Sequence, residues 1–167
     1  MKLTDLLTRK KSRIVDGWLR VIYESYAAET AIFLKKDKDR FDNPVGASIS
    51  QGIKGLYDAL LVEMDTDRVL AFLDEIIKIR AIQNFSPSQA LAFIFLLKNV
   101  IREELAKELR AEDLSGELLE LESRIDGLAL LGFDVYTKRR EKLCEVRVNE
   151  IKNRVSGLLR RTGLDLA

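Results

Sequence analysis

The sequence predicts an all-α protein. Hydrophobic residues make up 47% of the 167 residues and charged residues 33%, which fits a helical fold with a salt-rich surface and excludes a disordered chain. Apolar residues recur at steps of three and four along most of the chain, the spacing of one helix face. Proline occurs twice, so helices can run long and uninterrupted.

The first amphipathic helix is expected from Ser12 to about Ala27. Its apolar side includes Trp18, Tyr23 and Tyr26, which lie at helical spacing, while charged residues fill the other side. A short apolar cluster at residues 31–33 ends this region. The mixed-charge run at residues 35–40 then predicts a loop.

A second helix is expected from Asn43 to about Met64, because Asn is a good N-cap and Pro44 has its φ already set for the first helical position. One face of this helix is unusually small, and it consists of Ser48, Gly52, Gly55 and Ala59. Such a face allows a close helix crossing, which is one interpretation. The other is that it leaves room for a ligand.

The third helix begins at residues 65–67, where Asp and Thr can cap it, and ends near Phe85. Ser86, Pro87 and Gln89 then predict a capping box at the start of a fourth helix. Residues 90–97 are apolar on every side, which predicts a central helix buried all round. Its amphipathic second half is expected to continue to Arg110.

The last helix is expected to begin near Asp113 or Ser115 and to continue to about Arg161. Unbroken, it would be on the order of 70 Å long at about 1.5 Å per residue, which exceeds what one small domain can cover. It must therefore bend, most easily near Gly127 or Gly132, or pack against another chain. Residues 137–161 are a helical extension or dimerisation segment in this prediction. Its candidate dimer seam is Val148, Ile151, Val155 and Leu158.

The chemistry available to the chain is limited because it contains no histidine. This excludes a His-ligated heme, the usual nitrogen-containing zinc sites, a Ser-His-Asp triad and a histidine general base. The single cysteine, Cys144, cannot form an internal disulfide, although it could pair with Cys144 of another subunit. The carboxylates lie on polar helix faces and at caps. We therefore expect no catalytic residues, no cofactor and no metal.

Charge and hydropathy restrict the location and the partners. Lys and Arg total 28 and Asp and Glu total 27, so the net charge is +1 and nothing favours nucleic-acid binding. The N-terminus lacks the apolar run of a signal peptide, and no stretch has the length of a membrane span. With one unpaired cysteine, these observations predict a soluble, cytoplasmic protein of a single domain, residues 1–167.

One stretch carries a family resemblance. Residues 79–90 read Ile-Arg-Ala-Ile-Gln-Asn-Phe-Ser-Pro-Ser-Gln-Ala, and Phe-Ile-Phe-Leu-Leu-Lys follows at residues 93–98. Together with Trp18, Tyr26 and residues 41–46, this resembles the RsbRD N-terminal domain family, named for the RsbT co-antagonist proteins, over about residues 18–135. The motif positions are Arg80, Gln83, Phe85, Ser86, Pro87, Ser88 and Gln89.

The resemblance implies a globin-like helical domain that binds no heme, forms dimers and serves as a sensory input module in bacterial stress signalling. Members of that system carry a following STAS domain, and none is expected within residues 1–167, so stressosome assembly and RsbT antagonism are not carried over from the resemblance. The presence of Ser86, Pro87 and Gln89 in the motif is explained by their role in starting a helix. Nothing in the neighbouring sequence explains the presence of Arg80 and Gln83.

Two hypotheses follow from the sequence. The first is a regulatory or sensory homodimer with the last helix as its output or pairing element, acting on a protein signalling partner. The second is a small-molecule carrier with a helical pocket, for which the candidate lining residues are Trp18, Tyr23, Gly52, Gly55, Phe93 and Phe95. The sequence does not name the stimulus, the ligand, the partner or the role of Cys144.

Overall fold

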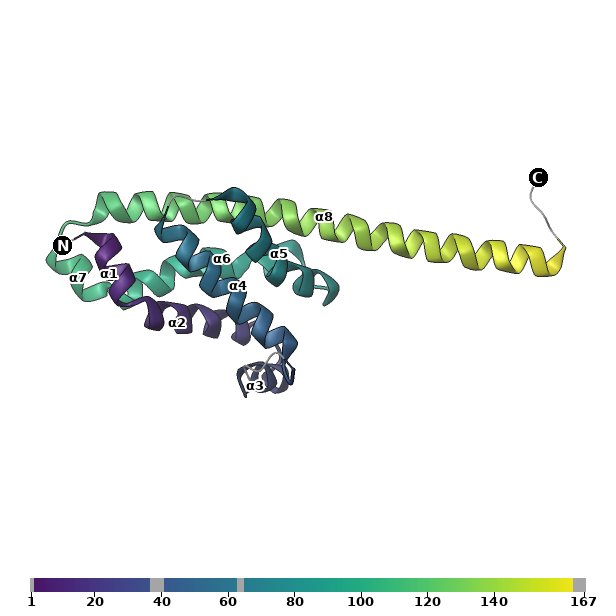
Figure 1. The fold of residues 1–167 in the computed structure, drawn as a ribbon, viewed down its shortest axis with the longest axis horizontal. Coiled ribbons are helices and arrows are strands. Elements are labelled where there is room, and N and C mark those ends of the chain that lie inside the picture. Colours follow the sequence, from purple (N-terminus) through teal and green to yellow (C-terminus); the bar gives the residue numbers. More distant parts are fainter. Residues whose placement is uncertain (1, 37–40, 63–64, 164–167) are drawn as a thin grey trace.

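The computed structural model describes residues 2–36, 41–62 and 65–163. Within these residues the chain forms eight helices and no strand, which confirms the all-α prediction (Figure 1). In chain order they are α1 (Leu3–Arg9), α2 (Lys11–Glu24), α3 (Ala28–Lys36), α4 (Pro44–Leu61), α5 (Thr66–Ile82), α6 (Pro87–Glu104), α7 (Ala106–Ala111) and α8 (Ser115–Thr162).

The predicted helices are present, with differences at their ends. Helix α1 was not predicted from the sequence, although its Leu3, Leu6 and Leu7 are buried. Residues 35 and 36 of the expected loop still belong to α3, and residues 37–40 lie outside the described residues. The expected end of the second helix, Met64, also lies outside them, while α4 itself ends at Leu61.

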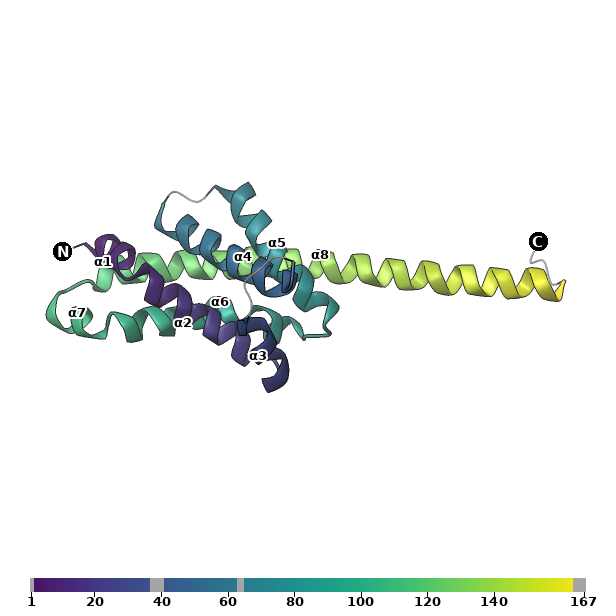
Figure 2. The ribbon, with the colours of Figure 1, turned by 60° about the horizontal axis from the view of Figure 1, so that its bottom comes forward.

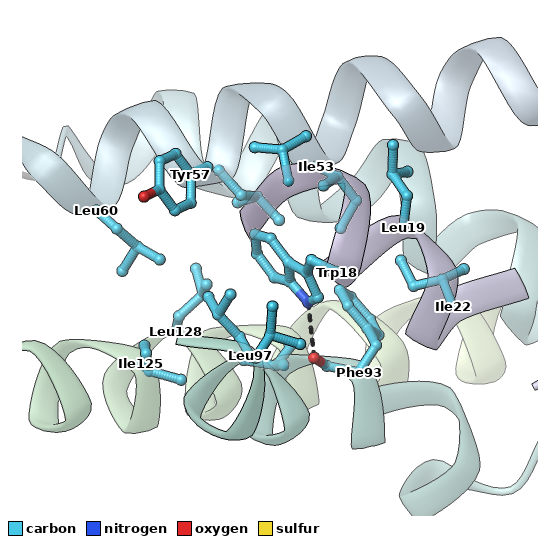
Figure 3. Packing of buried hydrophobic residues seen from close by; sticks show 14 of the residues in the cluster. Trp18, Leu19, Ile22, Ile53, Tyr57, Leu60, Phe93, Leu97, Ile125 and Leu128 are labelled. Carbon is cyan, nitrogen blue, oxygen red and sulfur yellow. Dashed lines mark hydrogen bonds between the residues drawn. The ribbon is translucent and has the colours of Figure 1, made fainter. Parts of the chain in front are cut away.

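The core lies between α2, α4, α5, α6 and the first half of α8, which together form a helical body (Figures 1 and 2). Trp18 is fully buried at its centre, close to Ile53 of α4 and Phe93 of α6 (Figure 3). Its indole Nε1 donates a hydrogen bond of 2.7 Å to the Phe93 carbonyl oxygen. The one polar atom of this large side chain is therefore satisfied inside the core.

The prediction that α6 is buried on every side is wrong. Ala90, Ile94 and Leu97 are buried, but 51% of Phe95 and 40% of Leu96 are exposed. The reason is that α6 packs mainly against α2 on one side and α8 on another, so that a third apolar face remains uncovered. The helix also ends at Glu104 instead of reaching Arg110, and α7 follows as a separate short helix.

The small face of α4 packs closely against α5. A Cβ atom at Gly52 would lie 2.8 Å from Ile76 Cγ1, and one at Gly55 would lie 2.4 Å from the Phe72 ring. A larger residue at either position would therefore collide with α5. This favours close helix packing over room for a ligand at Gly52 and Gly55.

Helix α8 is continuous through both Gly127 and Gly132 and extends far beyond the body (Figures 1 and 2). Its 48 residues correspond to roughly 70 Å at about 1.5 Å per residue. Leu121, Ile125, Leu128 and Tyr136 are buried against the body. From Glu141 to Thr162, a segment we call the stem, the side chains are exposed or half-buried. Across the part of the chain that the structure describes, no helix combines the length and the apolar character needed to traverse a bilayer.

Candidate functional site: the motif cluster and its connection to α8

The motif residues form the turn between α5 and α6. Asn84 adopts φ 59°, a left-handed conformation that Asn tolerates, and reverses the chain after α5. The Ser86 hydroxyl oxygen accepts a bond from the Gln89 N–H at 3.3 Å, and Gln89 Oε1 accepts one from the Ser86 N–H at 3.0 Å. This confirms the predicted capping box, with Pro87 in the first turn.

Arg80 is the central residue of what we call the motif cluster, which consists of Arg80, Ser25, Tyr26, Phe85 and Gln89. Although it is a cation, Arg80 is only 1% exposed. Its Nη2 donates to Ser25 Oγ and to the Gln89 carbonyl oxygen, each at 3.0 Å. Arg80 therefore connects the end of α2, the end of α5 and the beginning of α6.

Aromatic rings surround the guanidinium group of Arg80. Its central carbon lies 4.4 Å from the Phe85 ring centroid, 5.3 Å from that of Tyr26 and 5.8 Å from that of Phe93. Among the residues that the structure describes, no carboxylate forms an ion pair with it. The charge is thus stabilised by ring faces and two neutral acceptors instead of a counterion.

The electrostatics of the motif cluster follow from this burial. Burial lowers the pKa of Arg80, and the neighbouring Tyr26 phenol partly offsets the shift. Burial also raises the pKa of Tyr26, with Arg80 acting in the opposite direction. Within the described residues, Arg80 Nε, Arg80 Nη1 and the Tyr26 hydroxyl have no partner inside the normal limits of hydrogen-bond geometry. Arg80 itself is closed to solvent, whereas Tyr26 and Phe85 are half-buried and Ser25 and Gln89 are exposed, so the cluster is a structural junction packed around one buried cation.

The remaining motif residues have separate surroundings. Gln83 follows α5 as its C-cap and is exposed, and nothing in the structure explains its side chain. Ser88 is also exposed, with its hydroxyl 3.2 Å from that of Ser86. Phe85 is half-buried, and its ring contacts Tyr26 edge-on at 5.5 Å between centroids.

Three residues of α8 attach this helix to the motif region, and the sequence analysis missed all of them. The Tyr136 hydroxyl donates to the Phe85 carbonyl oxygen at 2.6 Å. Arg140 Nη1 donates to the Ala81 carbonyl oxygen at 3.2 Å, and Arg139 pairs with Asp74 of α5. The partners are 51 to 65 residues apart in sequence. Local periodicity carries no signal for such pairs, because it reports only which face of a helix is apolar.

The candidate pocket residues are not gathered around one cavity. Trp18, Tyr23 and Phe93 are packed in the core, and their side chains are at most 5% exposed. Gly55 lines a cavity of about 230 Å³ with Phe72 and Arg68. Phe95 lies elsewhere, in an apolar surface groove between α6 and α8. Residues two positions apart in a helix are rotated by about 200° and so point to nearly opposite faces, which is why Phe95 does not follow Phe93 into the core.

The candidate seam residues are all on the stem. Val148 and Val155 are each 48% exposed, Ile151 is 59% exposed and Leu158 is 60% exposed. They share one face of α8, because they step by three and four residues. Val146 is also 48% exposed but lies on the opposite face. Cys144 is a free, exposed thiol on the same face as the seam.

The described residues thus form a packed helical body joined to a long helix whose second half is exposed. In the described part of the chain, no group of three or more His, Cys, Asp or Glu side chains is placed to hold a metal ion. Residues 12–151 match the family model described as the RsbT co-antagonist protein rsbRD N-terminal domain. The chain belongs to this family, which is a regulatory family of stress signalling and not an enzyme family. No match was found among curated proteins or among solved structures.

Proposed function

We propose that the chain is a signal-input domain of globin-like type that binds no heme and acts as a homodimer in the cytoplasm. In this proposal α8 is the output element, which passes the state of the body to a protein signalling partner. Membership of the RsbRD N-terminal domain family and the absence of histidine support it. The chain is then one domain, residues 1–167, with residues 137–161 as its helical extension.

The observation that carries the proposal is the attachment of α8 to the motif cluster. Tyr136 bonds to the backbone of the turn at Phe85, Arg140 bonds to Ala81 in the last turn of α5, and the stem begins directly after Arg140. A change at Arg80 or Phe85 would therefore reach α8 through two direct hydrogen bonds. The motif residues have a role in this proposal as the junction between the body and the output helix.

The exposed seam supports the homodimer. The four aliphatic side chains of the seam lie on one face of the exposed stem and leave apolar surface in water, which pairing with a second copy would bury. The expected partner is a second copy because an isologous contact needs only one self-complementary surface.

A matched pair of variants tests the homodimer. Val148→Asp places a charge in the seam, while Val146→Asp places the same charge on the opposite face at the same initial exposure. We expect Val148→Asp to weaken association by at least tenfold, equivalent to about 1.4 kcal/mol, and Val146→Asp to leave it unchanged. Sedimentation velocity over a range of concentrations measures both. A wild-type monomer throughout that range, or equal effects of both variants, would refute the homodimer.

A further inference from the structure

We propose that the cavity between α4 and α5 binds an amphipathic carboxylate with a tail of about eight carbon atoms. The tail lies between the two helices and the carboxylate lies on Arg68. Binding can be measured without reference to the function proposed above, whereas the role of this site as the signal input rests on that function.

The shape of the cavity follows from the register of α4 and α5. These helices are consecutive and antiparallel (Figure 1), and the Phe72 ring of α5 lies against Gly55 of α4. Four residues further along α4 and four residues back along α5, Ala59 therefore comes opposite Arg68. Ala59 has only a methyl group and the Arg68 side chain is exposed, so neither fills the space between the helices. The cavity is thus beside the closely packed glycines and not over them.

The cavity has the volume and the lining of a site for a short hydrocarbon tail. Its volume is about 230 Å³, and its wall includes the apolar side chains of Ala59, Val62 and Phe72. An apolar cavity of about 150 Å³ can hold benzene, which has six carbon atoms, so this one has room for about eight. Because such a wall offers no partner to a polar group, the head group of the ligand must lie at the rim.

The charges at the rim favour a carboxylate as the head group. The ionisable side chains there are Asp58, Asp65 and Arg68. Asp58 pairs with Lys11 at 2.5 Å, and Asp65, the N-cap of α5, accepts a hydrogen bond from the Asp67 N–H at 3.1 Å. Arg68 forms no ion pair or side-chain hydrogen bond with any residue that the structure describes. The unused charge is therefore positive, and a carboxylate can accept two parallel hydrogen bonds from a guanidinium group.

Both helices that line the cavity are bonded to α8. Arg124 Nη1 donates a hydrogen bond of 3.0 Å to the carbonyl oxygen of Leu60, which follows Ala59 in the last turn of α4. Arg139 pairs with Asp74 of α5. A ligand that fits one separation of α4 and α5 better than another shifts these two attachment points relative to each other. Occupancy of the cavity therefore has a direct physical route to the output helix.

Titration of the full chain with three probes tests the head group. Octanoate, octylamine and octanol share one tail length and differ in charge, and amide chemical shifts measured by NMR report their binding. We expect octanoate to shift residues 55–62 and 65–72 saturably and to bind about fivefold more tightly than octylamine. Octylamine that binds as tightly as octanoate would overturn the proposal, because the rim would then prefer a cation.

A matched pair of variants tests the role of Arg68. Arg68→Gln should weaken octanoate binding about three- to fivefold, the range of an exposed ion pair, and leave octanol binding unchanged. Arg20→Gln removes an exposed arginine of α2 and should change neither. Equal weakening of octanoate and octanol by Arg68→Gln, or no weakening of octanoate, would show that the carboxylate does not lie on Arg68.

A second matched pair tests the position of the tail. Ala59→Leu fills the cavity and should weaken octanoate binding about tenfold or more, while thermal melting shows that the fold is retained. Ala71→Leu adds the same bulk at an exposed position of α5 outside the cavity and should have no effect on binding. Undiminished octanoate binding in a folded Ala59→Leu variant would place the tail elsewhere and overturn the site.

Chain length distinguishes a bounded cavity from adsorption on an apolar surface. From butanoate to octanoate, the affinity should rise about three- to fourfold for each added methylene group. From octanoate to dodecanoate it should rise much less, because the additional methylene groups remain in water. A constant gain for each methylene group up to dodecanoate would contradict the cavity.

The outcomes also separate this site from the proposed function. With octanoate bound, amide hydrogen exchange should change on α8 near Arg124 and Arg139 as well as at the cavity. Binding without any change on α8 would overturn the role of the site as the input and leave the site itself in place. A chain that binds octanoate but remains monomeric in sedimentation would refute the homodimer and leave the site intact.

Discussion

At the scale of single residues, Arg80 has the most unusual surroundings in the described structure. A buried cation loses several kcal/mol of hydration, and here no carboxylate compensates it. Two hydrogen bonds and three ring faces offset the loss. Because the desolvation of a buried charge usually cancels much of what its contacts contribute, we expect the volume of the Arg80 side chain to matter more for stability than its charge.

This balance predicts different results for two substitutions of Arg80. Arg80→Met keeps an unbranched side chain of similar length and should change the free energy of unfolding by less than about 1.5 kcal/mol. Arg80→Ala removes the same charge but leaves a cavity among the rings, and should cost about 2–5 kcal/mol. Chemical denaturation measures both. Equal losses in the two variants would contradict this balance and would mean that the guanidinium and its hydrogen bonds to Ser25 and Gln89, not the volume of the side chain, determine the cost.

The glycines of α4 and α8 give a second prediction at this scale. Gly52→Ala should destabilise the protein by about 1–3 kcal/mol, because its Cβ would lie 2.8 Å from Ile76, which is fully buried and cannot move aside. Gly127→Ala meets nothing within 4 Å and should stabilise α8 by about 0.5–1 kcal/mol. Thermal melting should therefore show shifts of opposite sign, and a stabilised Gly52→Ala would contradict the close packing of α4 and α5.

At the scale of elements, the connection between α8 and the α5–α6 turn is the feature most relevant to signalling. Tyr136 is buried on α8, and its hydroxyl reaches the Phe85 backbone. Arg139 and Arg140 extend the attachment by one further turn toward the stem. Movement of the turn is therefore opposed by α8, and movement of α8 is opposed by the turn.

Removal of one hydroxyl should weaken this connection without disturbing the core. Tyr136→Phe keeps the ring but leaves the Phe85 carbonyl oxygen without this donor, which costs about 1–2 kcal/mol. Hydrogen exchange should rise in residues 81–89 and around residue 136, and remain unchanged near Trp18. Uniformly faster exchange over the body, or no local change, would show that the bond does not hold α8 to the turn.

Element positions were largely predictable from the sequence, because caps and periodicity are local. Asn43, Asp65 and Ser86 all act as the N-caps that their residue types indicate. The helix α1 was missed because Leu3, Leu6 and Leu7 form only one short turn of apolar spacing. The error over Phe95 has a different cause: an apolar side chain in a helix indicates burial against something, and the sequence does not say whether this is the same chain.

At the scale of the whole molecule, two parts differ in what surrounds them. The body buries its core residues around Trp18. The stem exposes its apolar residues to solvent, and so does the surface formed by Phe95 and Leu96 of α6 and Leu130 and Phe133 of α8. The family could be predicted because the motif around Arg80 is contiguous in sequence, and the all-α architecture because the spacing of apolar residues is a local signal. The junction of the motif with α8 could not, since Phe85 and Tyr136 meet only after the chain has folded.

Tyr136 lies near the middle of α8, with the body on one side and the stem on the other. The first half of α8 is fixed in the body by Leu121, Ile125 and Leu128, so the stem is a lever whose base is Tyr136. A small change in the direction of α8 at Tyr136 therefore becomes a larger displacement at Thr162, and a rotation of α8 about its axis changes the direction in which Cys144 points.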